Sequence, residues 1–279
     1  MDKPTGEMLA GSPRLRRRVG LGRPARRRRV RHGPRHPLRF ARAELATSRH
    51  VEGEGGDTQH MVVVIGNVLK AEDLAALREA ADRLDYQDGR NTAGRYAREV
   101  KANLQAKPSP ELDAIFEKVR KTLNANEMVT SIARPRRYAR MLLSRYRGGM
   151  AYGTHVDDPV MNGTRTDLSF TLSLSDPETY TGGALVMEDP VEDRAITLRA
   201  GDMVLYPTSA LHRVEPVTEG ERVAIVGWIT SWVRDPGRRE ILHDLDVAAR
   251  GIFEAHGKTA AFDRVFKAKA NLSRMWYDD

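Results

Sequence analysis

The sequence predicts an α+β fold in which a β-rich middle portion is flanked by helices on both sides. Apolar residues recur at helical spacing before residue 125 and again after residue 235. Between residues 138 and 232 the apolar period changes to two, as in strands. Turn signals about 8–12 residues apart divide this portion into short strands, which is typical of a β-sandwich or barrel.

The elements before the β-rich portion are a short strand and two helices. Val62–Ile65 is an apolar run typical of a buried strand, and helical periodicity over residues 74–84 follows it without an obvious N-cap. Residues 88–94 read as a polar loop. Ser109 and Pro110 open the second helix as N-cap and first helical residue, and Asn124–Asn126 ends it. Its apolar face consists of Leu112, Ile115, Phe116, Val119 and Leu123.

Eight strands are expected in the middle portion, at residues 138–147, 153–158, 168–175, 183–188, 195–199, 202–206, 210–216 and 222–232. In the third, large apolar residues alternate with small polar ones. The apolar face packs on neighbouring helices. The polar face of Ser169, Thr171 and Ser173 suits either the lining of a ligand cavity or a solvent-facing surface, and both interpretations stay open.

Two helical segments follow the last strand. Asp235-Pro236 opens the first, and a second helical pattern begins after Gly257. These helices either cap the barrel or pair with another subunit, so a homodimer is one expectation. We therefore expect a β-rich domain over residues 61–232 and a helical extension over residues 233–279.

Positive charge is concentrated at the start of the chain. Residues 1–60 hold 15 Lys or Arg and 6 Asp or Glu, a balance of +9, whereas the other 219 residues hold 31 and 32, a balance of −1. Like charges at this density repel one another, so we expect residues 1–60 to form a disordered arm. Three explanations of the arm are open: synthesis that starts at Met61, an arm that binds nucleic acid by phosphate neutralisation, or a targeting peptide.

Composition excludes several classes of protein. The chain has no cysteine, so any metal must be held by His, Asp or Glu. The lack of cysteine also agrees with a cytoplasmic protein. No run of about 18 apolar residues is present, which argues against a membrane helix. Neither a G-x-S-x-G elbow nor a phosphate-binding G-x-x-x-x-G-K-[ST] loop occurs.

A histidine and an aspartate two residues apart form the most informative pattern in the sequence. His155 and Asp157 have the spacing that places two side chains on one face of a strand. His212 follows 55 residues after the aspartate, and Arg222 ten residues later at the start of an apolar strand. Two histidines and one carboxylate are the ligands of the facial triad that holds non-haem Fe(II). Arginine binds carboxylates through two parallel hydrogen bonds and keeps its charge.

These residues and their surroundings resemble the bacterial PKHD-type hydroxylases, relatives of the prolyl 4-hydroxylases among the Fe(II)/2-oxoglutarate dioxygenases. The resemblance covers residues 61–279 and rests on the blocks YGTHVDDPVM (152–161), RTDLSFTLSLSDP (165–177), GGALVMED (182–189) and GDMVLYPTSALHRVEPVT (201–218). It implies a double-stranded β-helix (jelly-roll) core with flanking N- and C-terminal helices. Thr154 and Asp158 depart from the family's usual acidic residue and asparagine.

The resemblance also implies a reaction and its cofactors. His155, Asp157 and His212 would bind Fe(II), and Arg222 would anchor 2-oxoglutarate. The enzyme would couple oxidative decarboxylation of 2-oxoglutarate, with O2, to hydroxylation of an unidentified substrate, and L-ascorbate would keep the iron reduced. The alternative is a non-catalytic metal-binding jelly-roll protein with a nucleic-acid-binding arm, but it leaves Arg222 without a role.

Three further features allow two interpretations each. Arg213 competes with Arg222 for the anchoring role. Tyr146 either points its hydroxyl at the cosubstrate or packs at a strand end. The basic cluster of residues 134–140 (RPRRYAR) either attracts an acidic substrate or is a solvated strand entry. We expect the loops at residues 88–94 and 158–166 to form the pocket walls.

Overall fold

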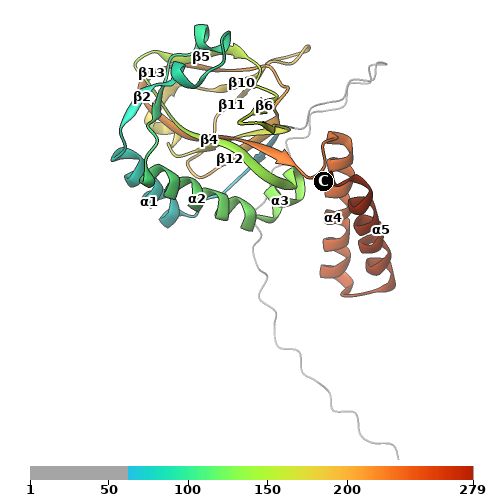
Figure 1. The fold of residues 1–279 in the computed structure, drawn as a ribbon. Coiled ribbons are helices and arrows are strands. Elements are labelled where there is room, and N and C mark those ends of the chain that lie inside the picture. Colours follow the sequence, from blue (N-terminus) through green and yellow to red (C-terminus); the bar gives the residue numbers. More distant parts are fainter. Residues whose placement is uncertain (1–61, 279) are drawn as a thin grey trace, which may run out of the picture. The chain divides into compact units, whose positions relative to one another are not determined.

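The computed structural model describes residues 62–278. The expectations for residues 1–60 and for a start at Met61 lie outside these residues. The described residues form a double-stranded β-helix with helices on either side of it in sequence (Figure 1). The predicted fold class is therefore confirmed.

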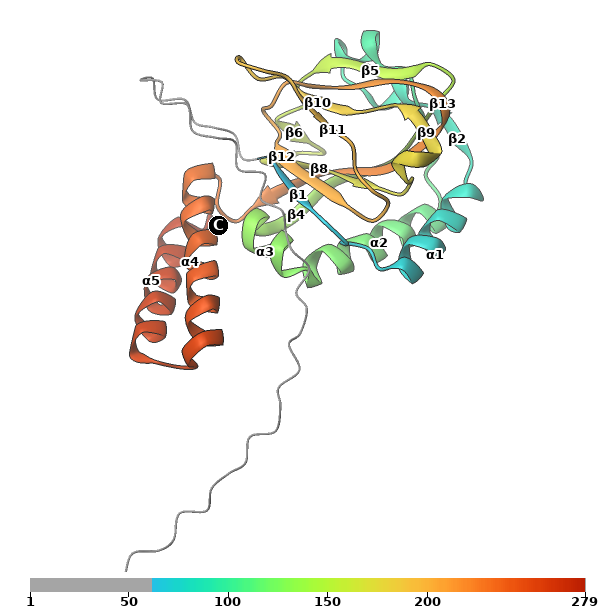
Figure 2. The ribbon, with the colours of Figure 1, turned by 180° about the vertical axis from the view of Figure 1, so that it is seen from behind.

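Two layers of antiparallel strands share one long strand, β13 (His212–Ser231). The larger layer has the order β1-β12-β8-β13-β4-β3-β2. The smaller layer is built around the first half of β13, which pairs with β5, β9 and β10, and β10 in turn pairs with β11 (Figure 2). The bounds of these strands are β1 Val63–Ile65, β2 Tyr86–Asp88, β3 Leu104–Ala106, β4 Pro135–Arg147, β5 Met150–His155, β8 Leu168–Ser173, β9 Tyr180–Gly182, β10 Leu185–Met187, β11 Arg194–Ile196 and β12 Met203–Pro207.

The expectation of separate strands at residues 210–216 and 222–232 was wrong. Both belong to β13, which continues through Glu219-Gly220 instead of turning there. Gly220 adopts a left-handed φ of 69°, and its backbone lies directly against Thr179. The strand bends at this point and passes from one layer to the other. His212 and Arg222 thus lie on the two halves of a single strand.

Several short elements were missed. Strands β2 and β3 form a hairpin that extends the larger layer, β9 lies at the edge of the smaller layer, and β6 (Val160–Met161) pairs with β7 (Thr164–Arg165). Single turns of 3-10 helix occur at Gly89–Thr92, Ala97–Val100 and Pro177–Thr179. Strands of two or three residues carry too little periodicity to be recognised in a sequence.

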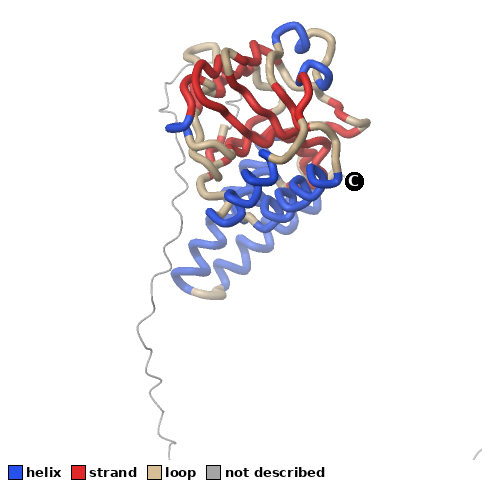
Figure 3. The backbone as a smooth tube through the Cα atoms, turned by 90° about the vertical axis from the view of Figure 1, so that its left-hand side faces the viewer, coloured by secondary structure: helices blue, strands red, loops and turns tan. Residues whose placement is uncertain are grey.

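Three helices cover the outer face of the larger layer (Figure 3). They are α1 (Ala71–Asp82), α2 (Pro110–Ala125) and α3 (Glu127–Ala133). Ser109 caps α2 as predicted, since its hydroxyl accepts a hydrogen bond from the Leu112 amide. Asn126 ends α2 and at the same time caps α3, a helix that was not predicted from the sequence. The helices bury their apolar faces against alternate residues of the strands, including Phe170, Leu172, Val223, Ile225 and Ile229.

The remaining two helices, α4 (Pro236–His256) and α5 (Ala260–Trp276), pack against each other at the end of the chain. Asp235 caps α4 through the Arg238 amide, and Thr259 caps α5 through the Phe262 amide. Helix α4 also contacts α3. None of the helices in the described part of the chain combines the length and apolar content that crossing a membrane requires.

Candidate metal centre

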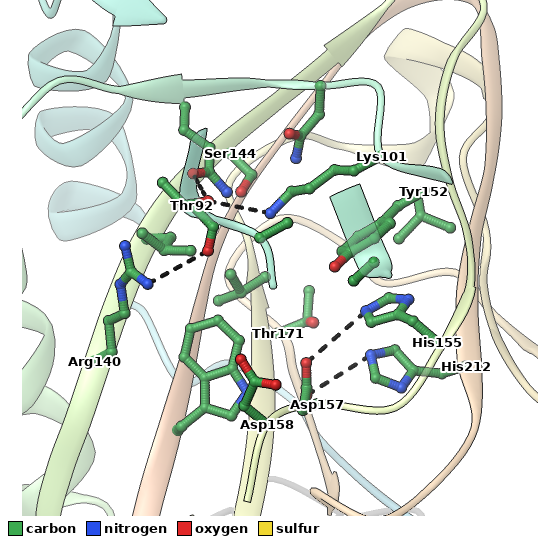
Figure 4. A pocket seen from close by; sticks show the side chains of 18 of the residues that line it. Thr92, Lys101, Arg140, Ser144, Tyr152, His155, Asp157, Asp158, Thr171 and His212 are labelled. Carbon is green, nitrogen blue, oxygen red and sulfur yellow. Dashed lines mark hydrogen bonds and ion pairs between the residues drawn. The ribbon is translucent and has the colours of Figure 1, made fainter. Parts of the chain in front are cut away.

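Three side chains converge between the two layers. His155 ends β5, His212 begins β13, and Asp157 lies in the segment after β5. One potential ligand atom from each lies within 4.8 Å of the others. The Nε2 atoms of both histidines are 3.8 Å from the Asp157 carboxylate, one from each oxygen (Figure 4). Two imidazole nitrogens and a carboxylate oxygen therefore face a common point.

The two imidazoles are held in matching orientations. His155 Nδ1 lies 2.9 Å from the Gly153 carbonyl oxygen, and His212 Nδ1 lies 2.9 Å from the Ala210 carbonyl oxygen. A carbonyl only accepts, so each Nδ1 carries the proton and each Nε2 keeps a lone pair. That is the tautomer a metal-binding histidine needs. The Nε2 of His212 also lies 3.5 Å from the Tyr206 hydroxyl oxygen. The β-ladder pairs His212 with His155, so the two rings approach to 4.2 Å between centroids.

The surroundings favour the neutral form of His155 and hold the Asp157 carboxylate in place. Burial, reinforced by the neighbouring His212, lowers the pKa of His155 to about 4. Ser169 on β8 donates a hydrogen bond of 2.7 Å to Asp157 Oδ2. Tyr152 stacks on the His155 ring with 3.6 Å between centroids. The three side chains are each less than 10% exposed: 7% for His155, 8% for Asp157 and 4% for His212.

The local structure differs from the expectation for these residues in one respect. Asp157 was expected on the same strand as His155, but β5 ends at His155. The carboxylate reaches the histidines from the loop after the strand, and Ser169 holds it there. The polar face of β8 lines the interior as one interpretation proposed, since Thr171 faces the pocket and Ser169, Thr171 and Ser173 are all buried.

Arg222 lines the same pocket as the three residues. It is 6% exposed, and its guanidinium lies over the ring of Tyr146, 5.5 Å from the centroid. Tyr146 is its neighbour in the ladder between β13 and β4. Tyr146 both packs in the inner core and lines the pocket, so its two interpretations are compatible. Within residues 62–278, Arg222 forms no ion pair with a carboxylate.

Of the other basic residues considered for the site, only Arg140 lines the pocket. Arg213 points away from the pocket and forms ion pairs with Glu188 and Asp193 on the surface. The cluster of residues 134–140 does not act as a unit. Arg134 is buried in an ion pair with Asp246, Arg136 lies over the Trp232 ring, and Arg140 is the member that lines the pocket.

The pocket walls come partly from segments with no recognisable motif. The loops at residues 88–94 and 158–166 contribute as expected, through Thr92, Ala93, Gly94, Asp158 and Met161. Lys101, Asn103 and Trp228 line the pocket as well and were not anticipated. A lysine in a polar segment carries no signal of burial, because only the pairing of Lys101 with Tyr152 on β5 brings it to the pocket.

Comparisons with known proteins identify relatives of this chain. Residues 141–230 match the model of the 2OG-Fe(II) oxygenase superfamily. A PKHD-type hydroxylase of Maricaulis maris is 50% identical over 219 residues, which cover 78% of this chain and 100% of the relative. A PKHD-type hydroxylase of Parvibaculum lavamentivorans is 47% identical over 220 residues, with coverage of 78% and 100%. The crystal structure of a Pseudomonas putida prolyl-4-hydroxylase is 19% identical, with a TM-score of 0.43 over 62% of this chain and 94% of that one.

The fold and the superfamily match define an oxygenase that depends on Fe(II) and 2-oxoglutarate. Within this class, the chain belongs to the PKHD-type hydroxylases. The resemblance seen in the sequence is thereby confirmed, and so is the assignment as an enzyme that uses Fe(II), 2-oxoglutarate and O2.

The residues present fit an Fe(II) centre. The donor set is two imidazoles and a carboxylate, which suits non-haem Fe(II). Both histidines have their second nitrogen engaged, as metal-binding histidines do. The donors lie on the wall of a pocket that also contains a buried arginine without a carboxylate partner among residues 62–278.

Proposed function

We propose that His155, Asp157 and His212 bind the Fe(II) of this hydroxylase and that Arg222 anchors the remote carboxylate of 2-oxoglutarate. The observation that carries this proposal is the convergence of the three donors within 4.8 Å at one pocket that also holds Arg222. When bound, the iron supplies the oxidising chemistry that couples conversion of 2-oxoglutarate and O2 to succinate and CO2 with hydroxylation of a substrate C–H bond.

The protein's own residues bind and orient the metal and 2-oxoglutarate, and they exclude water from the site. Asp157 supplies one negative charge against the metal, and Ser169 fixes the direction of its carboxylate. Arg222 lies on the same strand as His212, so β13 sets the separation between the metal and the anchoring cation. Buried apolar residues such as Leu185 and Val214 line the pocket, and this dry surface strengthens the attraction between the guanidinium and a carboxylate.

Several finer expectations belong to the same proposal. L-ascorbate would keep the iron reduced. The reaction would take place in the cytoplasm, which rests on the lack of cysteine. Residues 61–232 would form the dioxygenase domain and residues 233–279 a helical extension, through which two copies would pair. A role of the arm in binding nucleic acid stays a prediction.

The test is succinate formation from 2-oxoglutarate by the full chain with Fe(II), ascorbate and O2. Enzymes of this kind turn over slowly without substrate, so none is added. His212→Ala should abolish succinate formation. Arg222→Ala should raise the KM for 2-oxoglutarate on the order of 100-fold, because losing one partner of a buried charge pair costs about 2–5 kcal/mol.

Arg213→Ala is the matched control, since Arg213 lies on the same strand but pairs with surface carboxylates. Its KM for 2-oxoglutarate should equal that of the unchanged protein. Equal KM values for Arg222→Ala and Arg213→Ala would refute the anchoring role. Succinate formation that survives in His212→Ala would refute the ligand set.

A further inference from the structure

The pocket holds more positive charge than 2-oxoglutarate requires. Lys101, Arg140 and Arg222 all line it. No carboxylate within residues 62–278 forms an ion pair with any of the three; Lys101 and Arg140 instead meet at Thr92. The proposed reaction uses Arg222 and leaves the other two cations without a role.

Lys101 is a deeply buried ammonium group. The residue is 6% exposed, and Nζ donates one hydrogen bond, of 3.3 Å, to the Thr92 hydroxyl oxygen. It also lies 4.8 Å from the centroid of the Tyr152 ring, the ring that stacks on His155. Lysine is almost never fully buried unless it is paired, because removing its charge from water is costly. An anion bound at this place would be a partner for the ammonium group.

Arg140 also contacts Thr92, the residue to which Lys101 donates. Its Nη1 lies 3.5 Å from the Thr92 carbonyl oxygen, so Thr92 separates the two cations (Figure 4). Arg140 pairs with Trp228 in the ladder, whereas Arg222 pairs with Tyr146. Residues 140 and 146 are six apart on one strand, which is roughly 20 Å at about 3.3 Å per residue. The end of the pocket at Arg140 is therefore separate from the end at Arg222.

Two buried polar side chains without hydrogen-bond partners within residues 62–278 line the same pocket. Trp228 is 8% exposed, and its indole nitrogen finds no acceptor among the described residues. Asn103, two residues from Lys101, is 3% exposed, and both polar atoms of its side chain are unpaired within the same part of the chain. Buried polar groups are nearly always hydrogen-bonded in folded proteins. Trp228 and Asn103 line the pocket, so a bound molecule can supply their partners.

The charges of the pocket indicate how many negative charges the missing partner carries. Its acidic residues are Asp157, which faces the metal position, and Asp158, at its exposed edge. With Arg222 assigned to 2-oxoglutarate and Asp157 to the metal, Lys101 and Arg140 face Asp158 alone. This leaves one net positive charge, which matches a single carboxylate better than a doubly charged phosphate.

We infer that Lys101 and Arg140 bind a carboxylate of the prime substrate, so that the enzyme hydroxylates an organic acid. The inference rests on the proposed function, because it takes Arg222 to be occupied by 2-oxoglutarate. The carboxylate would lie beside Thr92, close to the Tyr152 ring. The C–H bond that reacts would then lie between this anchor and the three metal-binding residues.

The ionisation of Lys101 agrees with this assignment. Burial, together with the nearby Arg140, lowers the pKa of Lys101 to about 8, while Asp157 and Asp88 act in the opposite direction. The amine is thus still largely protonated at neutral pH and gains the most from an added negative charge. A bound carboxylate should raise this pKa.

The test uses trifluoroacetate, the smallest practical carboxylate probe with a fluorine signal. The full chain is loaded with Zn²⁺, a redox-inert stand-in for Fe(II), and with saturating 2-oxoglutarate. Binding is followed by ¹⁹F NMR in a buffer of low ionic strength. Trifluoroacetate should bind, and neutral trifluoroacetamide of the same size should bind at least tenfold more weakly.

Lys101→Met and Arg140→Met remove each charge but keep an aliphatic chain, and each should weaken trifluoroacetate binding about tenfold. Lys101→Arg should retain most of the binding, and Arg213→Met is the control for loss of an arginine outside the pocket. A separate titration of 2-oxoglutarate should give the same affinity in Lys101→Met as in the unchanged protein.

Three results would overturn the inference. The first is 2-oxoglutarate binding without trifluoroacetate binding. The second is equal binding of the probe to Lys101→Met, Arg140→Met and the unchanged protein. The third is a Lys101→Met variant that loses 2-oxoglutarate, which would place Lys101 in the cosubstrate site. Failure of 2-oxoglutarate to bind to the unchanged protein would instead contradict the proposed function, so the two failures are distinguishable.

Discussion

At the scale of single residues, Asp157 depends on a hydrogen bond from a neighbouring strand. It lies beyond the end of β5, where no ladder holds its backbone, and Ser169 donates to its Oδ2 at 2.7 Å. The same hydroxyl lies 3.3 Å from the Thr208 hydroxyl. A residue that orients a metal-binding carboxylate affects metal affinity although it does not touch the metal.

Ser169→Ala should therefore weaken metal binding about 10- to 100-fold. The measurement is titration of the metal-free protein with Co²⁺, followed by its visible absorption. Ser173→Ala is the matched control, because Ser173 lies on the same face of β8 but donates to the Ser175 carbonyl oxygen. Equal affinities in the two variants would show that Ser169 does not orient Asp157.

At the scale of secondary-structure elements, β13 connects the two layers and places both ends of the site. Its continuity depends on Gly220, where φ is 69° and an added Cβ would lie 2.1 Å from the Thr179 carbonyl oxygen. Other residues adopt this conformation at a cost of about 1–2 kcal/mol, and the overlap adds to that cost. The bend therefore depends on Gly220.

Gly220→Ala should lower the free energy of unfolding by more than about 1–2 kcal/mol, the cost of the left-handed conformation alone. Gly251→Ala is the control, because the opposite change in the free energy of unfolding is expected for it. Gly251 lies within α4 with no atom within 4 Å of an added Cβ, so alanine should stabilise the helix by about 0.5–1 kcal/mol. Urea unfolding of both variants measures the difference, and destabilisation of similar size at the two positions would contradict the argument.

At the scale of the whole described molecule, a buried polar network connects the C-terminal helices to the β-helix. Ser131 on α3 hydrogen-bonds His243 Nδ1 on α4 at 2.9 Å, and Arg134 pairs with Asp246 at 2.7 Å. Lys269 on α5 joins the same carboxylate at 2.6 Å. Ser131, His243 and Asp246 include the residue types of a hydrolytic triad, but Ser131 contacts both partners at once and lies buried between helices. The cluster therefore connects α4 and α5 to α3 and Arg134 instead of forming a catalytic triad.

This network should make stability depend on pH. Burial lowers the pKa of His243 below its usual value of about 6.5, against the influence of Asp244 and Asp246. As pH falls below about 6.5, the unfolded chain binds the proton first, so the free energy of unfolding decreases until the folded pKa is reached. His243→Asn keeps a group that can hydrogen-bond Ser131 but cannot titrate. Urea unfolding at pH 7.5 and 5.5 should show a smaller difference for this variant, and an unchanged difference would exclude His243 as the cause.

Much of the fold was predictable from local chemistry. The helix over residues 110–125 follows from a serine cap, a proline at the first turn and an apolar face at helical spacing. The strand at residues 168–173 follows from strict alternation. The third helix spans only about two turns and the shortest strands only about one alternation, so neither repeats a pattern often enough to be recognised. The break expected at Glu219-Gly220 was wrong because a glycine permits a bend as readily as a turn.

The sequence by itself determined the class of fold, the family and the residues proposed to bind iron and 2-oxoglutarate. These depend on short spacings and blocks of residues that are read directly along the chain. The tertiary structure decided which arginine faces the pocket, since Arg213 and Arg222 lie on one strand and differ in the side to which they point. It also brought Lys101, Arg140 and Trp228 to one wall. Their proximity comes from strand pairing between segments far apart in the chain, and burial of a charge is a property of the assembled fold alone.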